Sequence, residues 1–467
     1  MTPLANLHPG PEAQAQPRRS SPSSHVLLIL IALLTAVSHF ILGTWYWSQW
    51  VNKEKNPPHP PLELRGEDYL RTFSGWGSLN ERDSSAYNTA ALNVIKSGVP
   101  RTRSGAVHMH APIYCYFLAL CYGIGGQNLV SVAVPQAMMA GLICFLVGLV
   151  AGRIAPQRKT AATLIAALLY LVNLRAAMYV GFVYPTVLLM LLTALTMAAA
   201  DRSSQKPAVA VIVGTMALAT FAQAAFFGVA SGVAAWLLLQ SWRERSVSQL
   251  FGGIAMFVVV ALKIVASTVG GTKDDLQQLD RGILWEVNNP HFEGMRLTSL
   301  WENRPGNPWT SWHESEQEQQ RYDSYMARAQ GDGQRASFLW IRENPGPYAT
   351  LCAIRLRTAL SPFTGQMSPR NRVISTVIWL LLFPASVYGL WVLRRHATGA
   401  LVMLAYAGYT ALATFITEDW YLRFRLPIET MLAVSAAVGY TALAETCRQR
   451  VARRRRASNS SNTAAIR

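Results

Sequence analysis

Charged residues are scarce in this chain. They make up 14% of its 467 residues, whereas hydrophobic residues make up 51%. Soluble domains carry about 25% charged residues, so the composition excludes an ordinary water-exposed globule. The apolar residues fall into long runs, such as 25–47, 129–152 and 250–268. A helix needs about 20 residues to cross a hydrocarbon core of about 30 Å, and the runs therefore predict a polytopic membrane protein.

Cysteine is also rare, and a cleavable signal peptide is missing. The five cysteines form no CxxC pair and have no histidines at metal-ligand spacing. They predict neither a disulfide framework nor a metal site. The first apolar run is too long for a signal peptide, and Trp45–Trp47 follow it where small residues would mark a cleavage site. We therefore expect an uncleaved first span with an aromatic belt at its outer end.

The net charge of +17 comes from basic residues that gather at the breaks between apolar runs. Short loops rich in Lys and Arg stay in the cytoplasm. Placing every cluster there predicts about ten spans in the inner (plasma) membrane, with both termini cytoplasmic. We expect the basic tail to contact anionic membrane lipids, and we expect no nucleic-acid partner. The clusters are Arg18-Arg19, Arg153 with Arg158 and Lys159, Arg202 with Lys206, Arg243 with Arg245, Arg394-Arg395, and Arg448–Arg456.

This threading divides the chain into a cytoplasmic tail at 1–24, a transmembrane domain at 25–444 and a basic cytoplasmic tail at 445–467. Two long hydrophilic loops of the domain face the outside, at 48–127 and 269–372. The predicted fold class is thus an all-α polytopic membrane protein with two long extracytoplasmic loops. Loops of such length are usually functional or disordered.

The first outer loop contains a helical pattern over 83–97. Asp83 lies one turn before Tyr87 and begins the same stripe, while Gly98 marks the end of the helix. The helical spacing predicts one buried stripe made of Tyr87, Ala90, Ala91, Val94 and Ile95.

Three further segments of the outer loops have recognisable patterns. An apolar helix is expected at 113–122, which is too short to span and so should lie at the membrane interface. In the second loop, 314–329 is expected to form a polar surface helix. The segment 336–360 should return the chain to the membrane.

Four segments, taken in chain order, resemble the polytopic glycosyltransferases with the GT-C fold that use lipid-linked sugars. The closest group is the bacterial family 39-like enzymes, which include protein mannosyltransferase and aminoarabinose transferase relatives. The segments are D-x-x-x-Y-x-x-A…G at Asp83, Tyr87, Ala90 and Gly98; H-x-P-x-Y at His110, Pro112 and Tyr114; NNPxxxG at Asn288–Gly294 with W-I-R-x-N-P at Trp340–Pro345; and Y-x-R-F-R-L-P-I-E at Tyr421–Glu429.

The resemblance implies a GT-C-like bundle and a defined reaction. A sugar would move from a polyprenyl-phosphate donor to a protein, lipid or glycan acceptor on the extracytoplasmic face. No organic cofactor is implied, and a divalent cation is left open. The chain departs from the family where Ser84 follows Asp83 in place of a second acid, and where Gln223 or Tyr184 stand at positions that carry Arg or Glu in relatives.

Within that reaction, Asp83 is the candidate general base, because a carboxylate must take the proton of the acceptor. Its alternative role is an N-cap of the following helix. Tyr87 and His110 are candidate substrate-binding residues. A histidine satisfied at the interface is the alternative for His110.

Arginine is the residue expected to hold the departing phosphate, since its planar fork matches phosphate oxygens. Arg423 and Arg425 are the candidates, and the alternative is an ion-pair cluster with Glu418 and Asp419. Other cations stand near the outer ends of apolar runs, where snorkelling to the interface is expected and phosphate contact is the alternative. These are Arg175, Lys263, Arg355 and Arg357.

Two other classes of function stay open from the sequence. A lipid-linked glycan transporter or flippase would need polar or broken spans near the midplane and an internal repeat, and the sequence shows no convincing repeat. An O-antigen ligase or polymerase would also place its functional loop outside, but without the D-x-x-x-Y motif.

Overall fold

The chain folds into α-helices wherever its structure is described. The computed structural model describes residues 22–54, 82–102, 105, 107–108, 111–223, 226–269, 288, 316–362, 369–415 and 422–465. These ranges contain the 3-10 helix η1 (Pro156–Arg158), one isolated β-bridge and no β-strand. A backbone in lipid must satisfy its own hydrogen bonds, and helices do so within each segment. The predicted all-α class is confirmed.

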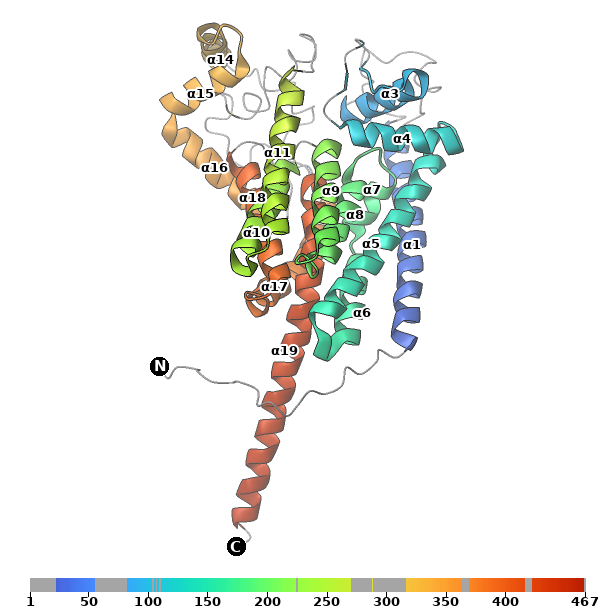
Figure 1. The fold of residues 1–467 in the computed structure, drawn as a ribbon, viewed down its shortest axis with the longest axis vertical. Coiled ribbons are helices and arrows are strands. Elements are labelled where there is room, and N and C mark those ends of the chain that lie inside the picture. The colour runs from blue at the N-terminus through green and yellow to red at the C-terminus, as the bar shows by residue number, and fades with distance from the viewer. Residues whose placement is uncertain are drawn as a thin grey trace.

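Eleven of the described helices run through the body of the molecule (Figure 1). Six are long and apolar enough to cross a membrane, and the number rises to seven if α6 and α7, bent by 57°, form one broken span. The predicted number of about ten spans stays a prediction. The helices are α1 (Pro22–Glu54), α5 (Leu129–Ile154), α6 (Lys159–Leu171), α7 (Leu174–Val180), α8 (Thr186–Ala200), α9 (Lys206–Ala222), α10 (Phe227–Glu244), α11 (Val247–Val269), α17 (Pro369–Val392), α18 (Ala397–Phe415) and α19 (Leu422–Ala465).

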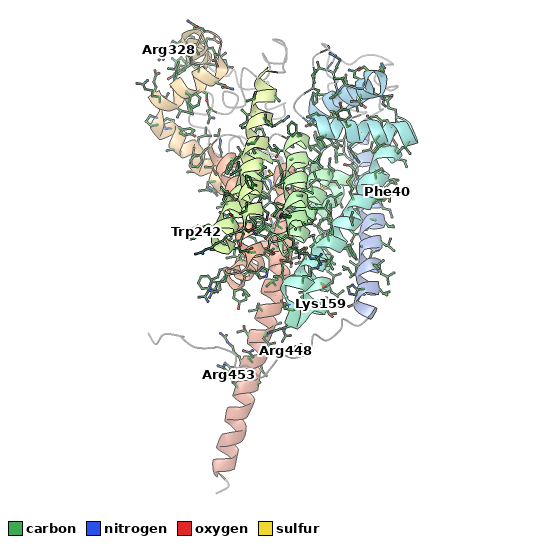
Figure 2. The ribbon with its side chains drawn as sticks, in the orientation of Figure 1. Phe40, Lys159, Trp242, Arg328, Arg448 and Arg453 are labelled. Atoms are coloured by element: carbon green, nitrogen blue, oxygen red, sulfur yellow. The ribbon has the colours of Figure 1, made fainter. Side chains whose placement is uncertain are left out.

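The bundle has two unlike ends. The helices of the outer loops lie together at one end, which we call the loop end (Figure 1). The start of α1 and the end of α19 lie at the opposite end, which we call the basic end, and Lys159, Arg448 and Arg453 lie toward it (Figure 2). The side of the membrane that each end faces stays a prediction. The loop-end helices are α3 (Arg82–Ser97), α4 (Pro112–Gly125), α14 (Glu316–Arg328), α15 (Gly333–Glu343) and α16 (Pro345–Leu360).

The helices expected in the outer loops are confirmed, with one correction to their packing. The helices α3, α4 and α14 match the expected segments, and α15 with α16 covers 336–360. Tyr87, Ala90 and Ala91 of α3 are buried as expected, but Ile95 is exposed. At about 100° per residue, position 95 is about 80° from position 87 around the helix and lies at the edge of the stripe.

The helix α19 is the central element of the bundle. In its apolar window 83% of the residues are buried, against 28% for α1. Close contacts with neighbours depend on small residues, as is usual for helices that pack in membranes. A Cβ added at Gly389 of α17 would lie 1.8 Å from the carbonyl oxygen of Ser435 on α19. Any side chain there would therefore separate the two helices.

Two of the predicted boundaries fall inside helices. The helix α1 continues to Glu54, past the expected start of the first loop at 48. The helix α19 has 44 residues and is unbroken across the predicted boundary at 444 and 445. At about 1.5 Å per residue it is about 66 Å long, roughly twice a hydrocarbon core. Its C-terminal part consequently projects beyond the bundle (Figure 1).

Candidate functional site

The predicted site residues are described to different extents. Asp83 lies in the first turn of α3 and Arg423 in the first turn of α19, and the side chains of both fall outside the described part. His110 also lies outside the described residues. Tyr87 and Arg425 are described with their side chains, and both are buried.

Tyr87 fixes α3 to the bundle. Its hydroxyl donates to Oε1 of Gln223, just after α9, over 3.4 Å. Its ring meets three others edge to face, with centroid distances of 5.8 Å to His108, 5.5 Å to Tyr114 and 6.4 Å to Tyr184. Edge-to-face pairs typically add about 0.5–1.5 kcal/mol beyond area burial. Because residue 83 lies one turn before Tyr87, this anchor also fixes the backbone position of the candidate base.

Arg425 belongs to a buried charge cluster that joins three helices, which we call the arginine cluster. Its Nε donates to Oε1 of Glu429 over 2.9 Å, one turn along α19. Arg175 of α7 donates through Nη2 to the other carboxylate oxygen of Glu429, and through Nη1 to Oγ of Ser375 on α17 over 3.0 Å. All three charged side chains are at most 2% exposed. One carboxylate thus orients two guanidiniums.

Further contacts hold Arg425 from both sides. Its Nη1 donates to the carbonyl oxygen of Ser361, just after α16, so the return segment of the second loop ends at this cluster. Its guanidinium carbon lies 4.7 Å from the ring centroid of Trp379 on α17, a distance typical of a cation–π contact. Glu418 and Asp419, the partners considered from the sequence, lie outside the described residues.

The expectation that Arg175, Lys263 and Arg355 snorkel to the interface is wrong. Each is less than 5% exposed. Nζ of Lys263 lies 5.4 Å from the ring centroid of Phe221 on α9, and Nη1 of Arg355 donates to Oδ1 of Asn288 over 2.9 Å. All three side chains are buried inside the protein, where other residues take the place of the membrane interface as their surroundings.

A run of aromatic residues connects the arginine cluster to the anchor of α3. Arg175 and Tyr179 lie one turn apart on α7 and so share a face of that helix. The ring centroid of Tyr179 is 6.3 Å from that of Tyr184, which is 6.4 Å from that of Tyr87. Contacts between aromatic rings therefore link α3, which carries Asp83, to α7, which carries Arg175.

The position of Arg175 depends on the break between α6 and α7, which the sequence did not predict. The break leaves the carbonyl oxygen of Leu171 near the end of α6, and Nε2 of His39 on α1 hydrogen-bonds to it over 3.2 Å. A Cβ added at Gly43, one turn further along α1, would lie 2.7 Å from the carbonyl oxygen of Ala177 on α7. The helix α1 thereby contacts α6 and α7 on either side of the break.

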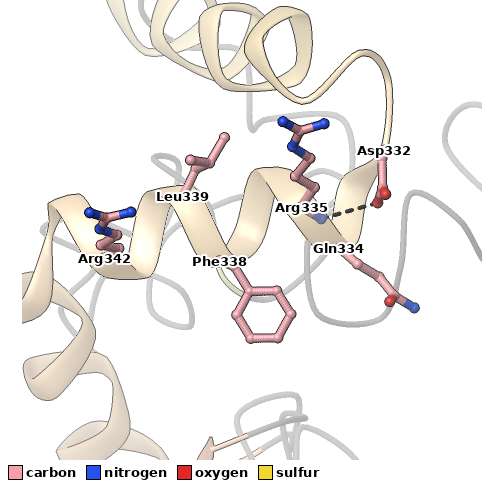
Figure 3. Close-up of a pocket in the computed structure, with 6 residues that line it drawn as sticks. All are labelled: Asp332, Gln334, Arg335, Phe338, Leu339 and Arg342. Carbon is pink, nitrogen blue, oxygen red and sulfur yellow. Dashed lines mark hydrogen bonds between the residues drawn. The ribbon is translucent and has the colours of Figure 1, made fainter.

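The helices α14 and α15 form a separate small unit. Arg328 and Glu343 form an exposed bidentate ion pair between them. The hydrogen bond from Arg328, with a smaller contribution from Tyr325, lowers the pKa of Glu343 from 4.5 to about 2. The face of α15 with Arg335, Phe338 and Arg342 lines an open hollow of about 360 Å³ (Figure 3). None of the predicted site residues lines this hollow.

Comparisons with known proteins assign no function to the chain, so a functional proposal depends on this geometry. No family model matches the chain, and no characterised protein or solved structure matches it. Within the described ranges, no group of three or more His, Cys, Asp or Glu side chains is arranged to hold a metal ion. What the fold defines is an all-helical protein with several helices able to span a membrane and a buried cluster of charges between them.

Proposed function

We propose that this chain is a membrane glycosyltransferase that moves a sugar from a polyprenyl-phosphate donor to a protein, lipid or glycan acceptor at the loop end. The observation that carries the proposal is the arginine cluster. Arg425 lies in the segment whose resemblance implies phosphate binding, and Glu429 joins it to Arg175, 254 positions away in the sequence. Charged N–H donors of this kind bind phosphate oxygens in strong hydrogen bonds.

The burial of the cluster adds to its value as a phosphate site. Donors that are fixed before the substrate arrives need not reorganise when charge develops on the leaving group, and they act more strongly where water is excluded. Glu429 and Ser375 supply that fixation for Arg175, while Trp379 and Glu429 supply it for Arg425. Nε of Arg175 has no hydrogen-bond partner within the described ranges.

The reaction we propose forms one bond and breaks one. The acceptor oxygen attacks the anomeric carbon of the sugar while its proton passes to the carboxylate of Asp83. The bond between the anomeric carbon and the phosphate oxygen breaks, and its electron pair leaves with the polyprenyl phosphate held by Arg175 and Arg425. General-base assistance of this type is typically worth about 10²–10⁴-fold in rate.

Tyr87 receives a different role from the substrate contact expected from the sequence. Its ring is enclosed by three aromatic side chains and its hydroxyl is bonded to Gln223. We assign it to positioning α3, and with it Asp83.

The membrane setting fits the chemistry of such a donor. A polyprenyl tail stays in the bilayer, so its phosphate is reached most readily by an enzyme embedded beside it. We propose that the protein lies in the inner (plasma) membrane, with the loop end extracytoplasmic and both termini cytoplasmic.

The test is Asp83→Asn in membranes that contain the full chain, assayed for transfer from polyprenyl-phosphate sugars. Glu81→Gln is the matched control, since it removes an acid two positions away. We expect Asp83→Asn to lower the rate by about 10²–10⁴-fold and the control to retain transfer. Near wild-type transfer by a normally expressed Asp83→Asn variant would remove Asp83 as the base. Wild-type protein that translocates the lipid-linked sugar without transferring it would instead be a flippase.

A further inference from the structure

The turn between α10 and α11 forms an open hollow on the flank of the bundle, toward the basic end. Its volume is about 660 Å³, and its lining residues are Ser241, Trp242, Arg243 and Arg245. Trp242 is 80% exposed and lies on the outer side of the bundle (Figure 2). Such exposure of a large indole is typical of a side chain at a lipid–water boundary.

The acid next to the two arginines, Glu244 at the end of α10, is hydrogen-bonded to α11. Nε2 of Gln249 on α11 donates to Oε2 of Glu244 over 3.0 Å, and also to Oγ of Ser203 in the turn between α8 and α9 over 3.3 Å. Arg243 and Arg245, on either side of Glu244, are exposed and form no ion pair with any described acid. The two guanidiniums at the hollow therefore have as their nearest acid in the sequence Glu244, which is hydrogen-bonded to Gln249.

The backbone at Arg245 is in a conformation that favours glycine. Its φ is 52° and its ψ is 38°, and its N–H closes α10 by donating to the carbonyl oxygen of Ser241. Glycine is the usual residue at such a left-handed helix end, because a Cβ is strained there. A residue other than glycine that keeps such a strained backbone is a candidate for a functional side chain.

An exposed apolar stripe begins at the hollow and follows α11 toward the loop end. Its members recur at helical spacing, and each is more than 40% exposed. A free phosphate ion would not need such a stripe, whereas the acyl chains of a lipid would cover it. The stripe consists of Val247, Leu250, Phe251, Ile254, Phe257 and Val258.

We propose that this hollow binds the headgroup of an anionic phospholipid. Arg243 and Arg245 hold the phosphate, Trp242 lies at the level of the headgroup, and the stripe on α11 contacts the acyl chains. Arginine suits the phosphate because its fork can form two parallel hydrogen bonds with it. The site is independent of the proposed transfer reaction and lies away from the arginine cluster.

The experiment uses the purified full-length protein in nanodiscs of phosphatidylcholine with or without phosphatidylglycerol. Lipids that stay bound after gentle extraction are counted by native mass spectrometry. We expect the wild type to retain phosphatidylglycerol in preference to phosphatidylcholine. Each arginine should contribute about tenfold to this preference, because a hydrogen bond between charged groups is worth more than the general attraction of one basic residue to an anionic surface.

Arg245→Gly separates binding from folding, because it removes the guanidinium while relaxing the backbone. We expect it to lower the preference about tenfold and to leave thermal stability unchanged or higher. Arg202→Gln is the matched control, since it removes one exposed positive charge from the neighbouring turn. An equal loss in the control would show general attraction to the surface and overturn the proposal. Complete displacement of the lipid by equimolar inorganic phosphate would also overturn it, because the acyl chains would then contribute nothing.

Discussion

Replacing Glu429 by glutamine should be the most damaging single change of charge in the membrane body. The carboxylate of Glu429 is the described partner shared by Arg175 and Arg425. A glutamine of nearly the same shape leaves both buried guanidiniums without that negative charge. Removing one partner of a buried ion pair typically costs about 3–5 kcal/mol, and here two cations lose the same partner. We therefore expect a loss at the upper end of that range.

The measurement is reversible unfolding in mixed micelles, with Glu343→Gln as the matched control. Glu343 also pairs with an arginine, but its pair with Arg328 is exposed, and solvent screens exposed pairs strongly. The control should therefore lose far less stability than Glu429→Gln. Equal losses for the two variants would refute the argument that burial determines the value of the Glu429 pair.

Two further predictions concern a support of the site and the α14–α15 unit. Gly43→Ala should lower the transfer rate by a larger factor than it lowers the folding equilibrium constant. A Cβ there would lie 2.7 Å from the carbonyl oxygen of Ala177 and would displace the helix that carries Arg175. Transfer kinetics and thermal unfolding of the variant test this, and an unchanged transfer rate would contradict it. The pairing of Glu343 should stabilise the α14–α15 unit above about pH 4.5 and be lost as the pH falls toward the lowered pKa of about 2. Hydrogen exchange in α14 and α15 measures this loss, and Glu343→Gln should abolish the pH dependence.

Local patterns in the sequence were enough to locate the helices of the loops. The apolar spacing from Tyr87 onward predicted a helix at 83–97, and the structure has α3 at Arg82–Ser97. Periodicity works here because the buried stripe and the terminating Gly98 both lie within one short segment. It also explains the error at Ile95, since the width of a stripe depends on the neighbour that covers it.

The arginine cluster could not be assembled from local patterns. Arg175 and Glu429 are 254 positions apart, and the apolar character of a span does not tell which neighbouring helix its few polar residues face. One signal was present but unused. An acid inside an apolar run is costly and usually has a partner, and Glu429 lies one helical turn after Arg425, where pairing is favoured.

The length of α19 makes it a long rod with one end in the charge cluster and the other beyond the far side of the bundle. A rod about 66 Å long that tilts by about 5° moves its far tip by about 6 Å. A tilt of α19 that displaces Arg425 too little to detect would thus produce a larger displacement at the opposite end of the helix. Cys447, an exposed thiol on the projecting part of this rod, provides a natural attachment point for a probe that would record such a tilt.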